Sequence, residues 1–428
     1  MLKTFQIERL CNIAYLDILI SGHNRDNLAD IMDYMLNEGF AESEKELPCM
    51  MTRAEWEQVA RDIISDSGLG GLFVMKFVND EQTGHRAFYF GSGNGEAYVV
   101  FRGTSGDIEW YDNGYGILSE ETPAQKAALD FVINVRAEAD VNYLCAAGHS
   151  KGGNKAQYCA VKAYSAVDSC VSVDGQGFSR LFIEKNSDVI EKARLKITAI
   201  AERRDFVNSL GFYLKEPLYY SGWRGTVKED CPYGQPLPYF HCPDALRLQT
   251  GNIGGTSSPG EIAQISYISK IINEFATYFL TVGKYGSNRE ETVLGLVSLM
   301  TGSGGGEKAV EALAQAALVF FELAATSGSF RDDLGNMLIF EKEAAAATAL
   351  MVKQSQKGTN GASGTNVVDK AMKRIAEKLL LKPAYFRYFI EDAERFVVFM
   401  NKAKEAKEHM GHISHFLKTI FAHIESLK

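Results

Sequence analysis

The sequence predicts an α/β protein in which a mostly parallel central sheet is covered by helices and followed by a helical C-terminal region. Between residues 71 and 250, short apolar runs alternate with segments of helical periodicity, at the spacing typical of parallel strands joined by crossover helices. From residue 251 onward the periodicity is helical throughout. We therefore expect an N-terminal helical segment over 1–70 packed on the core, an α/β core over 71–250, and a helical region over 251–428.

The N-terminal segment has apolar residues at helical spacing in three places, over 5–19, over 28–36 and from Thr52 onward. The third helix has a defined start, because Thr52 followed by Glu55 spells a capping box. A hairpin is expected next, since the strands predicted at 86–90 and 97–101 flank a glycine-rich turn.

The rest of the predicted core alternates helix and strand. The elements expected are a helix over 123–140, a strand up to residue 148, a helix to about 166, a strand over 170–173, a helix over 180–193 and a strand over 195–201. Residues 212–245 are rich in proline and read as loop. Beyond them, helices are expected at 260–282, 288–300, 307–326, 331–353 and 367–425, with a flexible loop near 354–366.

Composition restricts the class of protein. The net charge of −9 argues against nucleic acid as a partner, because phosphate binding needs a basic surface. The seven cysteines are scattered without a C-x-x-C pair, which indicates reduced thiols and a cytoplasmic location. No signal peptide and no transmembrane segment is expected, since every long apolar run carries charges. His409, His412 and His415 do not share one face of a helix, so no metal site is expected. The glycines at 302–306 do not form a P-loop, because no Gly-Lys-Ser/Thr follows them, and no cofactor is expected.

The motif G-x-S-x-G occurs where the strand ending near residue 148 meets the next helix. This is the pattern of the nucleophile elbow of α/β-hydrolases, in which Ser150 would be the nucleophile. Gly148 and Gly152 have no Cβ and so permit the close approach that the sharp turn requires. The backbone N–H of Lys151, at the helix start, would face a developing oxyanion. The alternative is a glycine-rich turn in which Ser150 only caps the helix.

A nucleophilic serine needs a base and an acid that orients the base. His241 is the only histidine between Ser150 and the helical C-terminal region, which makes it the candidate base by elimination. Asp174 and Asp205 each follow a predicted strand and are both candidates for the acid. Asp244 is a further carboxylate, although its closeness to His241 in sequence constrains the geometry.

Two stretches carry a resemblance to class 3 lipases. The run VVFRGT at 99–104 resembles their strand and oxyanion loop, and residues 108–112 resemble the stretch that follows it. The run GHSKGGNKA around Ser150 is similar to a largely uncharacterised bacterial group of lipase-like proteins. This resemblance, which covers about 70–245, implies an α/β-hydrolase fold and hydrolysis of carboxylic esters. It also implies that Thr104 donates to the oxyanion.

The resemblance favours Asp205 as the acid, because Asp205 and Val207 match the Asp-x-Val pattern at the place where class 3 lipases carry theirs. Asp174 is then the runner-up. The chain departs from typical class 3 lipases in having Lys151 directly after the serine and in its long helical C-terminal region.

These observations lead to the hypothesis of a serine hydrolase that cleaves a small-molecule or lipid-like ester through an acyl-enzyme. The same three groups also serve thioesterases and peptidases. A third hypothesis is a non-catalytic interaction protein on a hydrolase scaffold, because fold alone does not fix function. The sequence leaves the head group, the acyl length and the oligomeric state open.

Overall fold

The structure is a computed structural model. It describes residues 1–20, 26–37, 51–224, 240–248, 262–283, 286, 288–300 and scattered positions from 312 to 333. The chain forms two compact units. The first comprises Met1–Gly225 with Pro238–Ile265, and the second comprises Thr226–Leu237 with Ser266–Lys428.

The first unit is built on a seven-stranded sheet whose strands follow one another in sequence order. They are β1 (Phe73–Asp80), β2 (His85–Gly91), β3 (Glu96–Phe101), β4 (Tyr143–His149), β5 (Ser169–Val173), β6 (Ile197–Glu202) and β7 (Leu218–Tyr220). β1, β2 and β3 pair antiparallel, whereas each pair from β3 to β7 is parallel. The predicted α/β class with a mostly parallel sheet is therefore confirmed. The short β7 lies within the stretch that was expected to be loop.

The predicted hairpin is formed by β2 and β3, with Ala87 opposite Phe101 and Gly91 opposite Ala97. Gly93 and Gly95 in its turn have φ of 76° and 86°, values that side chains with a Cβ rarely adopt. The turn chemistry thus accounts for the position and register of the hairpin.

One face of the sheet is covered by the helices that connect the parallel strands. These include α6 (Pro123–Arg136), α7 (Lys151–Lys162), α8 (Arg180–Lys185) and α9 (Ser187–Ala193). When parallel strands follow in sequence order, right-handed crossovers all lie on the same face. The packing agrees, since Val99 and Phe101 of β3 are in one buried cluster with Val132 of α6 and Ala156 of α7.

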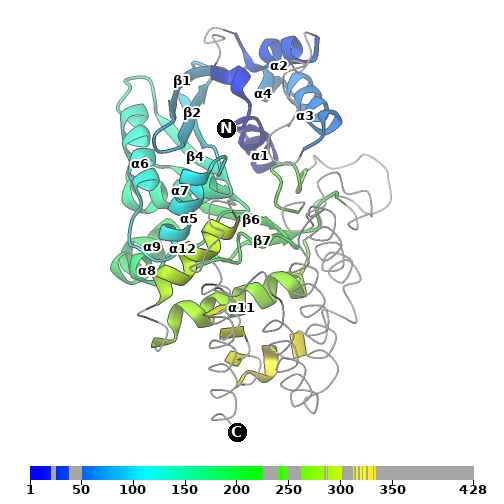
Figure 1. Ribbon diagram of the computed structural model, residues 1–428. Helices are drawn as coiled ribbons and strands as arrows, with labels where there is room; N and C mark the ends of the chain where they lie inside the picture. Colours follow the sequence, from blue (N-terminus) through cyan, green and yellow to red (C-terminus); the bar gives the residue numbers. More distant parts are fainter. Residues whose placement is uncertain are drawn as a thin grey trace. The chain divides into compact units, whose positions relative to one another are not determined.

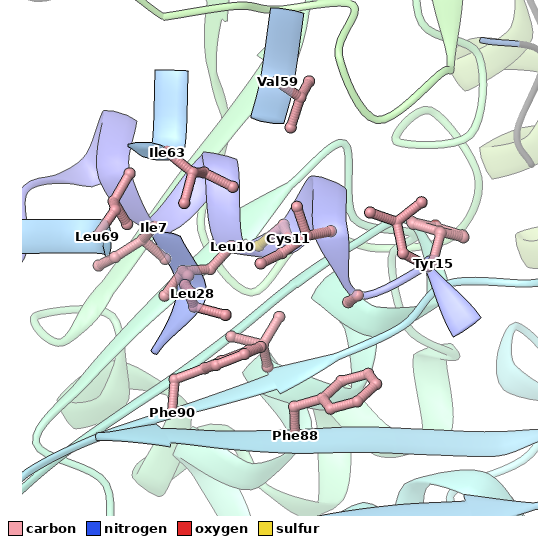
Figure 2. Packing of buried hydrophobic residues seen from close by; sticks show 14 of the residues in the cluster. Ile7, Leu10, Cys11, Tyr15, Leu28, Val59, Ile63, Leu69, Phe88 and Phe90 are labelled. Carbon is pink, nitrogen blue, oxygen red and sulfur yellow. The ribbon is translucent and has the colours of Figure 1, made fainter. Parts of the chain in front are cut away.

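The N-terminal helices cover the opposite face. They are α1 (Thr4–Ile13), α2 (Leu28–Asn37), α3 (Arg53–Ser65) and α4 (Ser67–Gly70), and Figure 1 shows them across the sheet from α6. Because side chains alternate along a strand, Phe88 and Phe90 of β2 point to this side. Figure 2 shows them facing Leu10 and Cys11 of α1, in the buried cluster to which all four belong. Without α1 to α4 this face of the sheet would be exposed to water.

Most helix starts follow from sequence. Thr52 accepts a hydrogen bond from the Glu55 N–H, so the predicted capping box of α3 is confirmed. The helix expected over 5–19 is shorter than predicted, because α1 ends at Ile13 and a separate 3₁₀ turn, η1, spans Asp17–Ile20. The helix expected over 180–193 is divided into α8 and α9 at Asn186, whose side chain donates to the Phe182 carbonyl.

In the second unit, the structure describes two helices of the predicted C-terminal region, α11 (Tyr267–Thr281) and α12 (Arg289–Met300). Ile271 of α11 is buried with Leu323 and Phe330. The helix expected at 331–353 beyond residue 333, the helix expected at 367–425, the loop near 354–366 and the histidines at 409, 412 and 415 lie outside the described residues. Among the described helices, none has the length and apolarity needed to cross a membrane.

Candidate active site

Ser150 lies on a strained turn between β4 and α7. Its φ of 59° and ψ of −127° are outside the regions that residues with a side chain usually occupy. The two motif glycines make the turn possible. A Cβ on Gly148 would lie 2.3 Å from the carbonyl carbon of Gly152, and one on Gly152 would lie 2.0 Å from the Phe101 oxygen. The turn geometry expected from G-x-S-x-G is therefore present.

His241 connects this serine to a carboxylate. Its Nε2 lies 2.8 Å from the Ser150 Oγ, and its Nδ1 lies 2.7 Å from the Asp205 Oδ1. The three residues come from separate parts of the chain, since Ser150 follows β4, Asp205 follows β6 and His241 follows β7. The structure thus brings the three predicted residues into one hydrogen-bonded chain.

Asp205 is held in place by donors of its own loop. Its side chain is buried and accepts hydrogen bonds from the backbone N–H groups of Val207 at 3.2 Å and Asn208 at 2.9 Å. The Asn208 side-chain amide donates a further bond at 2.7 Å. These bonds fix the carboxylate so that one oxygen faces Nδ1 of His241.

Asp174, the runner-up acid, is also buried but has other partners. It has a φ of 47°, and its Oδ1 accepts a hydrogen bond of 2.7 Å from the Glu202 N–H. Burial raises the pKa of Asp174 well above its usual range, and the nearby charge of Asp205 adds to this effect. The geometry therefore selects Asp205 over Asp174 as the partner of His241.

Asp244, the third carboxylate considered, anchors the segment that carries His241. Its Oδ1 lies 2.5 Å from Nη1 of the buried Arg9 on α1, and its Oδ2 accepts from Nε of Arg247 at 3.1 Å. The Trp223 indole N–H donates to the Asp244 backbone oxygen at 2.6 Å. An N-terminal helix thus helps to position His241, a contact over 235 residues that no local sequence pattern indicates.

His149, the residue before the serine, is a second histidine at the site. Its ring centroid lies 4.8 Å from that of His241, with an angle of 33° between the planes. Its Nδ1 lies 2.8 Å from the Tyr15 hydroxyl oxygen. Burial, with a smaller contribution from His241, lowers the pKa of His149 well below its usual value, so the ring is neutral at physiological pH. Sequence analysis missed both Tyr15 and His149.

Thr104 lies on the loop after β3, next to the serine. A Cβ built on the preceding residue, Gly103, would lie 3.0 Å from the Ser150 Cβ. The Thr104 hydroxyl accepts a hydrogen bond of 2.7 Å from the Asn113 side-chain amide, which leaves its own proton available for another acceptor. The Lys151 N–H is the first of α7, a position without an acceptor inside the helix. Both predicted oxyanion donors are thus on segments adjoining Ser150.

Charged groups are buried beneath this loop. Arg102 pairs with Glu109 at 2.9 Å, and the ammonium of Lys155 lies 3.9 Å from the other oxygen of Glu109. Burial lowers the pKa of Lys155 to about 8 despite the attraction of Glu109. Sequence analysis did not identify this network, because charged residues on a helix usually indicate a solvated face.

The described residues contain no group of three or more histidine, cysteine or acidic side chains that could hold a metal ion. Five cysteines in the described part of the chain are free and buried. They are Cys11, Cys145, Cys159, Cys170 and Cys242. Burial raises the pKa of Cys145 to about 11, so its thiol is protonated and unreactive at neutral pH.

The fold and these contacts define a mixed α/β protein with a hydrogen-bonded serine, histidine and aspartate beyond the carboxyl ends of its parallel strands. The family model described as Mbeg1-like matches residues 69–202. The matched segment contains Thr104, Ser150 and Asp174 but ends before Asp205 and His241. No curated protein matches the sequence.

Proposed function

We propose that this protein is a serine hydrolase of the α/β-hydrolase fold that cleaves carboxylic esters through an acyl-enzyme. The observation that carries the proposal is the pair of hydrogen bonds of 2.8 and 2.7 Å through which His241 joins Ser150 to Asp205. A serine hydroxyl becomes an effective nucleophile when a base can take its proton and an acid orients the base. The strained backbone of Ser150 supports the same proposal, since such strain is concentrated at functional sites.

In the first half of the proposed reaction, Oγ of Ser150 attacks the ester carbonyl carbon while its proton passes to Nε2 of His241. The positive charge that forms on the imidazole is stabilised by the carboxylate of Asp205 at Nδ1. The carbonyl oxygen becomes an oxyanion and accepts hydrogen bonds from the Lys151 N–H and from Thr104. Collapse of this intermediate breaks the ester bond, and His241 returns its proton to the departing alkoxide.

In the second half, water attacks the carbonyl carbon of the acyl group on Ser150 while its proton passes to Nε2 of His241. The bond between the acyl carbon and Oγ then breaks, His241 returns the proton to Oγ of Ser150, and the carboxylic acid is released. The His149 ring lies 4.8 Å from the His241 ring between centroids and is neutral, so it adds no positive charge beside His241 during this cycle.

The proposed substrate is a small-molecule or lipid-like ester. The resemblance of the Thr104 loop and the Ser150 elbow to class 3 lipases supports the ester class, as does the match to the lipase-like Mbeg1-like family. The free, buried cysteines support a reducing, cytoplasmic location. Thioesters and amides are alternatives that the same three groups would serve.

The proposal is tested by turnover of p-nitrophenyl esters of increasing acyl length, with a thioester and a peptide amide as comparison substrates. We expect Ser150→Ala to abolish ester turnover, and Asp205→Asn to lower kcat by about 10⁴-fold because the imidazole is no longer held in the required tautomer. Asp174→Asn is the matched control, since it changes a neighbouring buried carboxylate whose hydrogen bond in the described residues is to the Glu202 N–H and not to His241.

Wild-type protein that is folded but turns over none of these substrates would favour the hypothesis of a non-catalytic interaction protein. Preferential turnover of the thioester or the amide would support the assignment of the three catalytic residues but would change the proposed substrate class. A larger loss for Asp174→Asn than for Asp205→Asn would contradict the assignment of the acid.

A further inference from the structure

Lys151, the residue directly after the serine, has its side chain buried in an ion pair. Only 1% of the side chain is exposed, and its Nζ lies 2.7 Å from the Oδ2 of Asp112. The same ammonium donates a hydrogen bond of 3.2 Å to the Asp112 backbone oxygen. An unpaired buried ammonium is strongly destabilising, so a lysine at this position requires its partner.

Asp112 lies on α5 (Asp107–Gly116), the helix that follows the Thr104 loop. Its carboxylate also accepts hydrogen bonds from the Thr122 hydroxyl at 2.9 Å and from the Ala124 N–H at 3.2 Å. Burial raises the pKa of Asp112, but the Lys151 ammonium and these donors outweigh burial, so the pKa is lower than usual and the group is ionised. One fully paired carboxylate therefore joins α5, the start of α6 and the start of α7.

Asn113, the residue after Asp112, connects this ion pair to Thr104. The Asn113 side-chain amide donates to the Thr104 hydroxyl at 2.7 Å, and the Asn113 backbone oxygen accepts from the Gln176 side chain at 2.9 Å. A continuous series of contacts thus runs from the Lys151 ammonium through Asp112 and Asn113 to Thr104.

We propose that the Lys151–Asp112 ion pair is a positioning pair that fixes the Thr104 loop relative to the Lys151 N–H. The proposal rests on the proposed hydrolase function, in which these two groups hold the oxyanion. Oxyanion donors are effective when they are aligned before the reaction begins. Lys151 then acts twice, because its backbone donates to the oxyanion and its side chain holds the segment that carries the second donor.

The test uses Lys151→Met, Asp112→Asn and the double variant. Lys151→Met leaves the buried Asp112 carboxylate without its cation, so we expect a lower Tm and a kcat reduced by about 10- to 100-fold, with KM little changed. In the double variant the unpaired charge is absent, so we expect Tm to recover in part while kcat stays low. A purely structural ion pair would instead let kcat recover together with Tm.

Lys162→Met is the matched control, because Lys162 lies on the same helix and pairs with Glu121 at 2.8 Å but is partly exposed. We expect it to leave Tm and kcat close to wild type. A phenylboronic acid, which mimics the tetrahedral intermediate, should bind Lys151→Met more weakly by about the same factor as kcat falls.

Hydrogen exchange of residues 102–116 separates this proposal from the proposed function. We expect Lys151→Met and the double variant to exchange faster in this segment than wild type, and Lys162→Met to match wild type. Unchanged exchange in the first two variants, or recovery of kcat in the double variant, would overturn the positioning role. If the wild type were inactive but the variants showed the expected exchange pattern, the hydrolase function would be refuted. The conclusion that the Lys151–Asp112 pair holds the Thr104 loop in place would remain.

Discussion

The hydroxyl of Tyr15 and Nδ1 of His149 lie 2.8 Å apart, although 134 residues separate them in the sequence. Tyr15 follows α1, on one face of the sheet, and His149 ends β4 directly before the nucleophile candidate. The His149 ring in turn packs on His241. Together with the Arg9–Asp244 pair, this contact makes the N-terminal segment part of the support of the candidate site.

Tyr15→Phe removes the hydrogen bond between the Tyr15 hydroxyl and His149 and keeps the aromatic ring. We expect the free energy of unfolding to fall by about 1–3 kcal/mol, because a buried imidazole nitrogen loses its partner. We also expect kcat/KM for ester turnover to fall by less than about tenfold, since the ring of His149 remains in place. Urea unfolding and ester kinetics measure the two effects. Tyr34→Phe is the control, because Tyr34 is a residue that is 49% exposed, and equal losses in both variants would refute the prediction.

Arg9→Met removes the buried ion pair between Arg9 and Asp244. The Asp244 carboxylate then keeps its interaction with Arg247. Removing one partner of a buried ion pair costs about 3–5 kcal/mol, whereas an exposed pair contributes about 0–1 kcal/mol. Arg53, whose side chain is 59% exposed and which pairs with Glu57, provides the comparison. Chemical unfolding should show a loss for Arg9→Met several times that for Arg53→Met; similar losses would contradict the anchoring role.

Gly152→Ala tests the close packing at the elbow. The new Cβ would lie 2.0 Å from the Phe101 backbone oxygen, so either the turn or β3 must move. We expect little soluble protein, or a loss of more than about 4 kcal/mol in the free energy of unfolding. Gly106→Ala is the control, because a Cβ there meets nothing within 4 Å and the expected change is within about 0.5 kcal/mol. A stable, active Gly152→Ala would show that the elbow geometry is wrong.

The buried side chain of His85 should make the stability of the protein fall as the pH is lowered. Burial, reinforced by the Lys155 charge, lowers its pKa from 6.5 to about 3. The unfolded chain therefore binds a proton from about pH 6.5 downward, whereas the folded protein resists binding one until about pH 3. The contribution of neutral His85 to the free energy of unfolding is therefore complete above pH 6.5 and is lost as the pH falls toward 3.

We test this with His85→Phe, which keeps a ring beside Phe101 but cannot take up a proton. The unfolding free energy of wild type minus that of the variant should fall by up to about 1.4 kcal/mol per pH unit between pH 6 and 4. Groups common to both proteins cancel in this difference. A difference that is constant over the range would show that His85 titrates equally in the folded and unfolded states.

The sequence predicted those parts of the structure that depend on residues close together in the chain. Glycines and a turn identify the β2–β3 hairpin, a capping box identifies the start of α3, and G-x-S-x-G identifies the elbow of Ser150. His241 could be predicted because it is the only histidine between Ser150 and the helical C-terminal region, whereas Asp205 was favoured by the resemblance to class 3 lipases. The division between α8 and α9 was missed; Asn186 lies between the two helices, and its side chain donates to the Phe182 carbonyl.

Contacts between distant segments could not be predicted. Nothing local to Tyr15 indicates that it meets His149, and nothing local to Lys151 indicates that its side chain is buried against Asp112. Charged residues at helix positions are usually solvated, and only the three-dimensional structure shows that Lys151 and Asp112 are buried as a pair. The resemblance favoured Asp205 over Asp174, and the 2.7 Å distance between Asp205 and His241 agrees with that choice.

The central claim, that Ser150 is a nucleophile activated by His241, is tested most directly by a fluorophosphonate probe. Intact-mass analysis and peptide mapping of the native, full-length protein should find one adduct, on Ser150. The adduct should be absent from Ser150→Ala and strongly slowed in His241→Gln, while Asp174→Asn should still be labelled. Folded wild-type protein that stays unlabelled, or that is labelled at another residue in both wild type and Ser150→Ala, would contradict the claim.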